Sequence, residues 1–193
     1  MSIQEVEHFY PKTKQHWRKW LEKNHIRKDA VWLIHYKQNA NKPSLRWSDA
    51  VDEALCFGWI DSKGVTIDET SFKQYYCKRK PTSTWSKVNK EKIKQLIIDN
   101  KMTDAGLACI EIAKQNGSWT ILDEVEELII PKDLSKAFRD NKGSKKYFLS
   151  LSKSKQKVLL QWIVLAKQPQ TREKRIDEIA LRASEEKMPK HLT

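Results

Sequence analysis

Glycine is scarce in this chain, with five residues among 193. Walker loops and dinucleotide-binding loops each need several glycines within one turn, because only glycine lets the backbone approach a phosphate group so closely. The sequence contains no such cluster. These two kinds of nucleotide-binding motif are therefore excluded.

Cysteine is also rare, and the three residues present are Cys56, Cys77 and Cys109. They form no Cys-x-x-Cys pair, and three thiols are a poor basis for a disulfide framework. The five histidines show no spacing that is typical of metal ligands. We therefore expect reduced thiols, no bound metal and no cofactor.

Long hydrophobic runs are missing as well. Nowhere do eighteen apolar residues follow one another, and the N-terminal stretch MSIQEVEHFYPKTKQHW lacks the apolar core of a signal peptide. We therefore expect no membrane span and a cytoplasmic location.

Positive charge and tryptophan are abundant by contrast. The formal net charge is +12, the isoelectric point is about 9.5, and there are eight tryptophans. A basic protein meets polyanions faster than a neutral one, so nucleic acid and acidic proteins are conceivable partners. Lysine and glutamate are interspersed, however, and no run of five cations occurs, which favours a solvated surface. Nucleic-acid binding stays open as the less favoured alternative.

Hydrophobic spacing in the first half predicts a small sheet. Val31 to Tyr36 is a short apolar run of β-forming residues, which predicts a strand buried on both faces. Two further β-rich segments, Trp59 to Ile67 and Phe72 to Arg79, are separated by the turn-forming sequence DETS and predict a hairpin. Gly64 inside the first of them indicates a β-bulge. His35, alone on an apolar strand, is interpreted as a core residue.

Helical spacing dominates the rest of the chain. Helices are expected over residues 12–24, from Ser48 to the glycine of CFGW, and from N-terminal caps at Ser83 or Ser86, Thr103, Asp123, Ser154 and Thr171. We therefore predict an α+β protein, with a small, mainly antiparallel sheet and flanking helices followed by a helical C-terminal half. The expected subdomains are residues 1–100, with the β-hairpin, and residues 101–193, meeting near Ile98 to Met102.

The stretch from Ala54 to Asn89 concentrates aromatic, cationic and hydroxyl side chains. A helix that begins near Ser86 presents unpaired backbone N–H groups and the positive end of its dipole, and Arg79 and Lys80 come just before it. The predicted anion site consists of Asp61, Ser62, Arg79, Lys80, Ser83, Trp85, Ser86 and Asn89.

A purely structural interpretation of the same residues stays open. Serine and asparagine are good helix caps, and Asp61 can pair with Arg79 across the hairpin. Trp59 and Trp85 can both be core residues. In this interpretation the stretch carries no ligand.

A second cationic set, Lys167, Arg172 and Arg175, surrounds the break at Pro169. Arg172 and Arg175 can grip a phosphate or carboxylate, or they can pack and pair with the acids nearby, Glu173, Asp177 and Glu178. We favour packing, because helical charge is usually solvated or locally paired. No catalytic residue is expected, since Cys56 lies between apolar neighbours and reads as a buried, inert thiol.

Three segments resemble a known family. The runs EALCFGWIDS, RKPTSTWSKVNK and FLSLSKSKQKVLLQWIVLAKQPQTREKRI are similar to the YdeI/OmpD-associated family, also labelled bacteriocin-protection proteins, from Trp32 to about Ile179. The resemblance implies a link to stress and antimicrobial-peptide resistance, and it brings no settled reaction, cofactor or catalytic residue. The sequence departs from the family at Tyr76-Cys77-Lys78-Arg79, where it keeps the basic residue of a Phe-x-Pro-Arg type sequence and lacks the proline.

Composition, site and resemblance together favour a non-enzymatic cytoplasmic binding protein, associated with stress resistance, that has a cationic pocket for an anionic small molecule or an acidic protein partner. Two alternatives stay open: a nucleic-acid-binding protein, and an enzyme of unknown reaction that acts on an anionic small molecule. A nucleic-acid binder should present an exposed face of lysine with tryptophan or tyrosine. The sequence specifies neither the ligand nor the oligomeric state.

Overall fold

A computed structural model of the chain describes residues 6–192, so residues 1–5 of the N-terminal stretch and Thr193 lie outside it. The chain divides into two units, the first ending at Trp119 and the second beginning at Thr120. This division lies one helix later than the expected boundary at 98–102. The reason is that helix α4 (Asp104–Gln115) packs Ile110 and Ala113 into the core of the first unit.

Four strands form one mixed sheet in the order β1-β2-β4-β3. Strand β2 (Ala30–Tyr36) pairs antiparallel with β4 (Ser71–Lys78), and β4 pairs antiparallel with β3 (Trp59–Thr66) in the predicted hairpin. The edge strand β1 (His8–Phe9) runs parallel to β2 and is too short for a sequence pattern to reveal. The mainly antiparallel sheet is confirmed.

The β3–β4 ladder changes register between Asp61 and Gly64, which confirms the predicted bulge. Ser62 and Lys63 lie in this irregular part of β3, and both side chains are exposed. The bulge therefore displays a lysine at the edge of the sheet.

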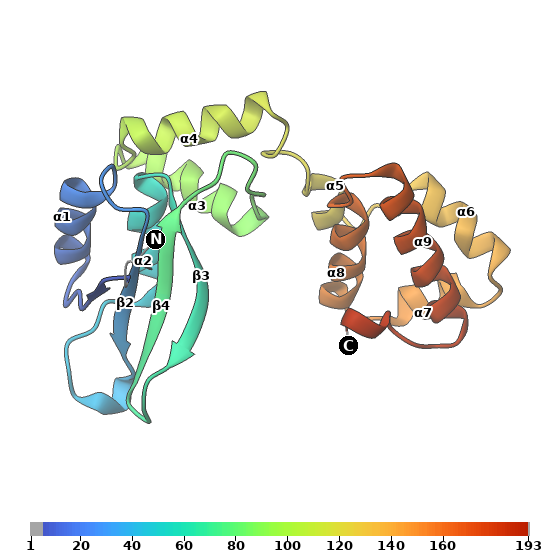
Figure 1. Cartoon of the computed structure of the whole chain (residues 1–193), viewed down its shortest axis with the longest axis horizontal. Coiled ribbons are helices and arrows are strands. Elements are labelled where there is room, and N and C mark those ends of the chain that lie inside the picture. The colour runs from blue at the N-terminus through green and yellow to red at the C-terminus, as the bar shows by residue number, and fades with distance from the viewer. Residues whose placement is uncertain (1–5, 193) are drawn as a thin grey trace, which may run out of the picture. The chain divides into compact units, whose positions relative to one another are not determined.

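Two helices pack beside the sheet, and their apolar stripes form the first core with the inward side chains of the strands (Figure 1). Helix α1 (Lys14–Asn24) contributes Trp17, Trp20 and Leu21, and helix α2 (Trp47–Cys56) contributes Ala50, Val51, Ala54 and Leu55. The N-cap residue of α2 is Arg46, so the predicted cap Ser48 lies inside the helix. A 3₁₀ turn, η1 (Gln38–Ala40), lies between β2 and α2.

Helices α3 (Lys87–Ile98) and α4 lie near one end of the sheet (Figure 1). Gly58 ends α2 with a φ of 71°, as predicted for a helix stop. A Cβ atom at Gly106 of α4 would lie 2.3 Å from the carbonyl oxygen of Cys56. Only glycine at this position lets α4 approach the C-terminal turn of α2 so closely.

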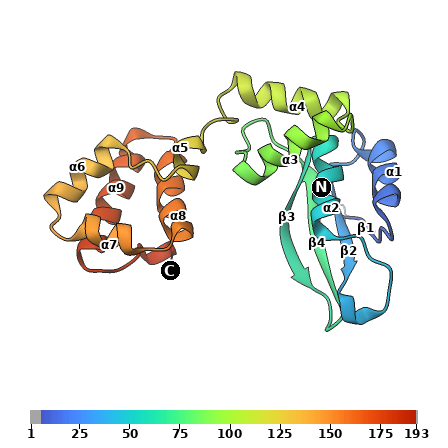
Figure 2. The same ribbon diagram turned by 180° about the vertical axis from the view of Figure 1, so that it is seen from behind.

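The second unit is entirely helical in its described residues, which confirms the helical C-terminal half (Figure 2). It consists of α5 (Asp123–Glu126), α6 (Lys132–Asp140), α7 (Ser144–Ser150), α8 (Lys153–Val164), α9 (Pro169–Ser184) and the 3₁₀ turn η2 (Lys190–Leu192). Its separate core includes Leu134, Phe138, Phe148, Leu160 and Ile179.

Helix starts were predicted with mixed success. Thr103 and Ser86 accept hydrogen bonds from the backbone N–H groups of Gly106 and Asn89 and are confirmed as caps. Thr171 is not a cap, because α9 begins at Pro169, a residue favoured in the first helical turn.

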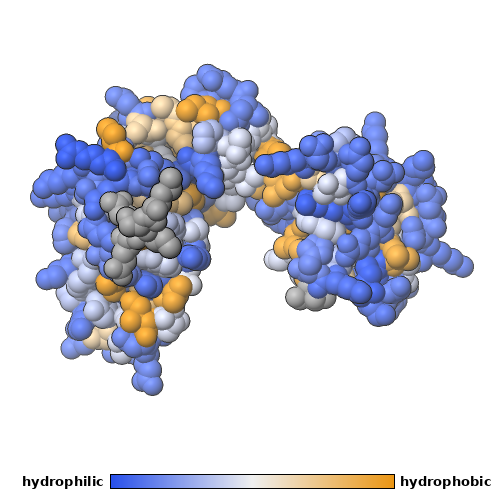
Figure 3. Space-filling model, in the orientation of Figure 1, coloured by the Kyte–Doolittle hydropathy of each residue, from blue (hydrophilic) through white to orange (hydrophobic). Residues whose placement is uncertain are grey.

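The face shown in Figure 3 is mostly hydrophilic, and its hydrophobic residues form small separate patches. Within residues 6–192, no helix combines the length and apolar character that crossing a bilayer requires.

Candidate anion-binding site

The eight residues of the predicted anion site take part in several separate sets of contacts. The Asp61 carboxylate accepts hydrogen bonds from Trp47 Nε1 at 3.0 Å and from Gln74 Nε2 at 3.2 Å. Ser62 and Lys80 are exposed. The ion pair between Asp61 and Arg79 that the structural interpretation allowed is absent from the described residues.

The hydroxyl residues near α3 have local roles. Ser86 Oγ accepts a hydrogen bond from the backbone N–H of Asn89 at 3.3 Å. The backbone N–H of Ser83 donates to the Lys80 carbonyl at 2.9 Å within the preceding turn. These contacts agree with the structural interpretation, in which such residues shape a loop and a helix start.

Arg79 and Trp85 are predicted site residues whose side chains contact each other directly. The guanidinium carbon of Arg79 lies 3.6 Å from the centre of the Trp85 ring, and its Nη1 donates a hydrogen bond to the Thr84 carbonyl at 2.7 Å. Arg79 is 8% exposed and Trp85 is 2% exposed. The Nε atom of Arg79 is buried and has no hydrogen-bond partner.

Arg79 is thus a buried cation that forms no ion pair with any carboxylate in residues 6–192. Burial lowers the pKa of Arg79 to about 10, against the opposing influence of Cys109, Asp61 and Cys77. The shift has this sign because burial removes the water that stabilises the charged form.

Arg79 lines a cavity of about 340 Å³. The walls are mainly apolar and include Ile26, Phe57, Trp59, Ala105, Ala108 and Ile112. Lys78 also borders the cavity, but its Nζ donates to the Asp29 carboxylate at 3.0 Å and to the Ile26 carbonyl at 2.7 Å. Arg79 is therefore the cation of this cavity whose charge is unmatched.

Sequence reasoning missed the wall that α4 contributes. Ala105, Ala108, Cys109 and Ile112 follow the i, i+3, i+4, i+7 spacing of one helical face, which was a usable signal. Assigning this helix to the C-terminal half separated it from the hairpin. The same division hid the approach of α4 to Gly58.

All three cysteines are free thiols, and none is primed as a nucleophile. Burial raises the pKa of Cys56 to about 11, with the Glu53 charge adding to the rise and Arg18 opposing it. Burial also raises the pKa of Cys109, against the influence of Arg79. The protonated thiol is the weaker nucleophile, so these residues have little reactivity at neutral pH.

The second cationic set is used for packing. Arg172 donates from Nε and Nη2 to the two carboxylate oxygens of Asp133, at 2.7 and 3.1 Å. Arg175 donates a hydrogen bond to the Trp162 carbonyl, and its guanidinium carbon lies 5.2 Å from the centre of the Trp162 ring. Lys167 is exposed and joins neither contact.

A cavity of about 530 Å³ beside Arg172 is unsuited to anions. Its lining contains four acids, Asp133, Asp140, Glu173 and Asp177, against two cations, Lys136 and Arg172. The Arg172 charge is already neutralised by Asp133. An anion entering this cavity would therefore meet net negative charge.

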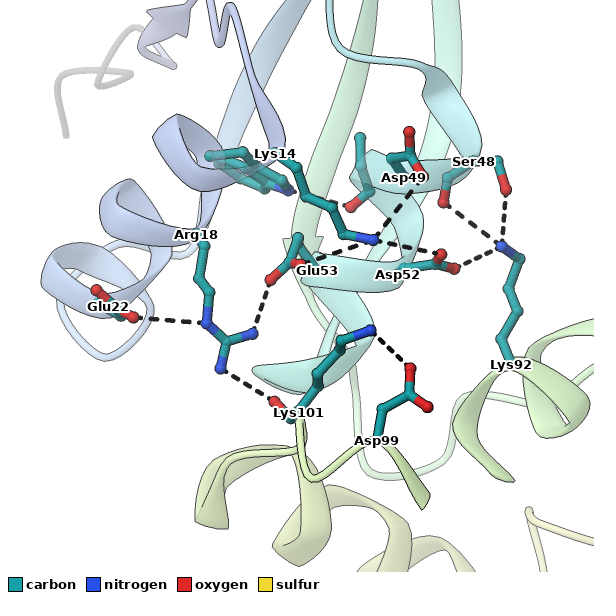
Figure 4. Close-up of polar contacts among 12 residues, drawn as sticks. Lys14, Arg18, Glu22, Ser48, Asp49, Asp52, Glu53, Lys92, Asp99 and Lys101 are labelled. Carbon is teal, nitrogen blue, oxygen red and sulfur yellow. Dashed lines mark hydrogen bonds and ion pairs between the residues drawn. The ribbon is translucent and has the colours of Figure 1, made fainter. Parts of the chain in front are cut away.

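A buried acid in α2 organises a second polar network that sequence reasoning also missed (Figure 4). Glu53, 3% exposed, accepts a hydrogen bond from Arg18 Nη1 at 2.8 Å, and Lys14 Nζ lies 3.9 Å from its other oxygen. Arg18 Nη2 also donates to the Lys101 carbonyl at 3.0 Å. The network connects α1, α2 and the segment before α4, and its role is structural.

Two family models match the chain. The model described as a domain of unknown function (DUF8412) matches residues 9–109, and the model described as bacteriocin-protection, YdeI or OmpD-associated matches residues 127–186. The second match confirms the resemblance over the second unit. The GWIDS and SxWSxxN motifs fall inside the first match instead, so the resemblance covers less of the chain than predicted. Searches of curated proteins and of solved structures gave no match.

Proposed function

Because the chain belongs to the family of the domain of unknown function DUF8412, and its second unit matches the bacteriocin-protection family, we propose that it is a non-enzymatic cytoplasmic protein that contributes to stress and bacteriocin resistance by binding an anionic small molecule. The ligand has a carboxylate or phosphate group on an apolar body. The observation that carries this proposal is Arg79, a buried cation that belongs to the lining of an apolar cavity and has no carboxylate partner in residues 6–192.

Energetics support a ligand at Arg79. Burying a charge without an opposite charge is unfavourable, because the interior replaces only part of the lost hydration. The Thr84 carbonyl and the Trp85 ring offset some of this cost. An anion held beside the guanidinium offsets more, so the bound state is favoured by the charge that destabilises the free protein.

The cavity walls indicate the size and chemistry of the part of the ligand that does not contact Arg79. A volume of about 340 Å³ lies within the usual range of small-molecule sites. Phe57 and Trp59 line the cavity and are buried, whereas Ile26 is exposed beside it. An apolar body covers this surface and adds hydrophobic stabilisation that inorganic phosphate lacks.

Chemistry at the cavity favours binding over catalysis. Burial keeps Cys109 protonated, since it raises the pKa of the thiol. His25 uses its Nδ1 atom in a contact with the Leu21 carbonyl at 2.8 Å. The thiol of Cys109 and the imidazole of His25, the two side chains of the cavity lining that most often react in proteins, are therefore poorly suited to catalysis.

The proposal is tested by calorimetric titration of the full-length protein with octanoate, octanamide and inorganic phosphate. We expect octanoate to bind at least about tenfold more tightly than octanamide, because only the carboxylate pairs with Arg79. Arg79→Gln should weaken octanoate binding by about tenfold or more, since it removes the charge and leaves a shorter, neutral polar side chain.

The matched control is Lys80→Ala, which removes an adjacent exposed cation that is not part of the cavity lining. This variant should bind octanoate within about twofold of wild type. Equal octanoate affinity in wild type and Arg79→Gln, with both proteins folded by circular dichroism, would contradict the proposal. Equal losses in the two variants would show that general positive charge, and not Arg79, attracts the ligand.

A further inference from the structure

A row of aromatic and cationic side chains crosses all four strands on one face of the sheet. His8 of β1 is in register with Trp32 of β2, and Trp32 is in register with Tyr75 of β4. Lys63, in the bulge of β3, reaches over both the Trp32 and Tyr75 rings. Together with Lys73, the next outward residue of β4, these side chains are called the aromatic row.

The aromatic row lies on the sheet face opposite α1 and α2. Residues of β2 alternate between buried and half-buried, and Trp32 belongs to the half-buried set whereas Val31 and Leu33 belong to the core. Tyr75 is half-buried, and its neighbour Tyr76 is buried against Trp17 of α1. The rings of the row thus remain partly accessible.

Distances within the row are short. The ring centres of Trp32 and Tyr75 lie 5.0 Å apart, and those of His8 and Trp32 lie 6.4 Å apart with planes inclined by 22°. The ammonium of Lys73 lies 4.7 Å from the Trp32 ring centre, and that of Lys63 lies 5.6 Å from Trp32 and 5.8 Å from Tyr75. Cations are held directly over rings that have no acidic neighbour in the row.

The four described strands contain little negative charge. Asp61 is the one acid among the residues of the four described strands, and its carboxylate is bonded to Trp47 and Gln74. A cavity of about 710 Å³ adjoins Tyr75 and is also lined by Arg27. The acids there, Glu7 and Asp29, are paired with Lys28 and Lys78.

We infer that the aromatic row is a binding surface for single-stranded nucleic acid. Bases stack on aromatic rings displayed by a sheet, and lysines beside the rings pair with the phosphates of the same strand. Unstacked bases have the apolar faces that fit Trp32 and Tyr75, and the backbone carries the charge that fits Lys63 and Lys73. None of the row residues lines the Arg79 cavity, so this inference is independent of the proposed anion ligand.

The test measures fluorescence anisotropy of a fluorescein-labelled twelve-nucleotide oligothymidine with the full-length protein at several salt concentrations. Lys63→Ala combined with Lys73→Ala should weaken binding at least about tenfold, and should lower the slope of log affinity against log salt by about 1.4. Tyr75→Leu should weaken binding about fivefold or more, and Tyr75→Phe should restore it, because stacking needs the ring.

A matched control removes two lysines of the same unit that lie outside the row. Lys94 and Lys114 are exposed and pair with Glu91 and Glu111 on their own helices. Lys94→Ala combined with Lys114→Ala changes the net charge equally and should leave affinity within about twofold.

Three results would overturn the inference. The first is equal weakening by the two lysine pairs, which would indicate attraction by net charge alone. The second is displacement of the oligonucleotide by polyglutamate as effectively as by unlabelled strand, which would indicate a surface for acidic chains. The third is equal affinity for duplex and single strand, because paired bases do not offer their faces to Trp32 and Tyr75.

Discussion

Arg79 in the first unit and Arg172 in the second were both considered as residues that could grip an anion, with packing favoured for Arg172, and their surroundings differ in one respect. Arg172 forms two hydrogen bonds to the Asp133 carboxylate, whereas Arg79 is buried against Trp85 and forms no ion pair with any carboxylate of the described chain. Arg172 is therefore neutralised by an acid of the same chain, whereas Arg79 retains its charge. From this comparison we expect a cationic motif to hold an anionic ligand only where the fold supplies no acid to pair with it.

The ion pair between the half-buried Arg18 and the buried Glu53 provides the largest test of this difference. Arg18→Ala should reduce the free energy of unfolding of the first unit by about 3 kcal/mol, because it leaves the buried Glu53 carboxylate without its closest partner. Urea unfolding followed by tryptophan fluorescence measures this effect, since seven of the eight tryptophans lie before Thr120. Lys94→Ala, which removes an exposed pair with Glu91, serves as the control and should change stability by less than about 0.5 kcal/mol. A loss of the same small size in Arg18→Ala would show that pairing does not stabilise cations in this fold.

The Arg172 pair in the second unit should have a smaller effect. Arg172→Ala is expected to cost about 1 kcal/mol, because both partners are partly exposed and water screens their attraction. A double-mutant cycle with Asp133→Ala, followed by circular dichroism at 222 nm, isolates the coupling between the two side chains. A coupling near zero would place Arg172 with the unpaired cations and weaken the comparison.

His35 extends the comparison to a second basic group of the first unit that is buried without an acidic partner. Its Nδ1 contacts the Leu45 carbonyl at 3.0 Å, its Nε2 has no hydrogen-bond partner, and burial lowers its pKa below 6.5 against the opposing effect of Leu45. The unfolded chain therefore binds a proton near pH 6.5 that the folded chain does not. Stability should fall as pH decreases below this value.

Urea unfolding from pH 7 to pH 5 tests the role of His35. The His35→Gln variant should lose less stability over this range than wild type, because glutamine does not titrate and can still donate to Leu45. His16→Gln, at an exposed position, should keep the wild-type dependence. Parallel curves for wild type and His35→Gln would assign the acid sensitivity to other groups.

Local patterns were sufficient for much of the fold. The strand β2, the turn before β4 and the bulge at Gly64 follow from neighbours within a few residues, and all are present. The expectation that β2 is buried on both faces was wrong, because its residues alternate between buried and half-buried. Caps at Thr103 and Ser86 are equally local. The expected boundary near residues 98–102 differs from the observed one at residues 119–120. Helix α4 is amphipathic, and its sequence alone does not show which of the two cores it packs into.

The candidate site was predictable only in part, for the same reason. Arg79 and Trp85 were identified from their chemistry, but the sequence did not show that the Asp61 carboxylate accepts a hydrogen bond from Trp47 of α2 and forms no pair with Arg79. Asp133 lies 39 residues before Arg172, while the acids considered beforehand were adjacent in sequence. Charge matching is decided by tertiary contacts, so a single sequence reveals the cations and not their partners.

Substitution of Arg79 should cause the smallest change in the free energy of unfolding and the clearest loss of octanoate binding. Arg79→Met keeps most of the buried volume and removes an unmatched charge, so the loss of the Thr84 hydrogen bond and the Trp85 contact is largely offset. The free energy of unfolding should stay within about 1 kcal/mol of wild type, while the stabilisation of the first unit by octanoate disappears. Fluorescence-detected urea unfolding with and without octanoate measures both quantities. A loss of about 3 kcal/mol, as expected for Arg18→Ala, would instead make Arg79 a structural residue whose contacts with Thr84 and Trp85 suffice to hold its charge.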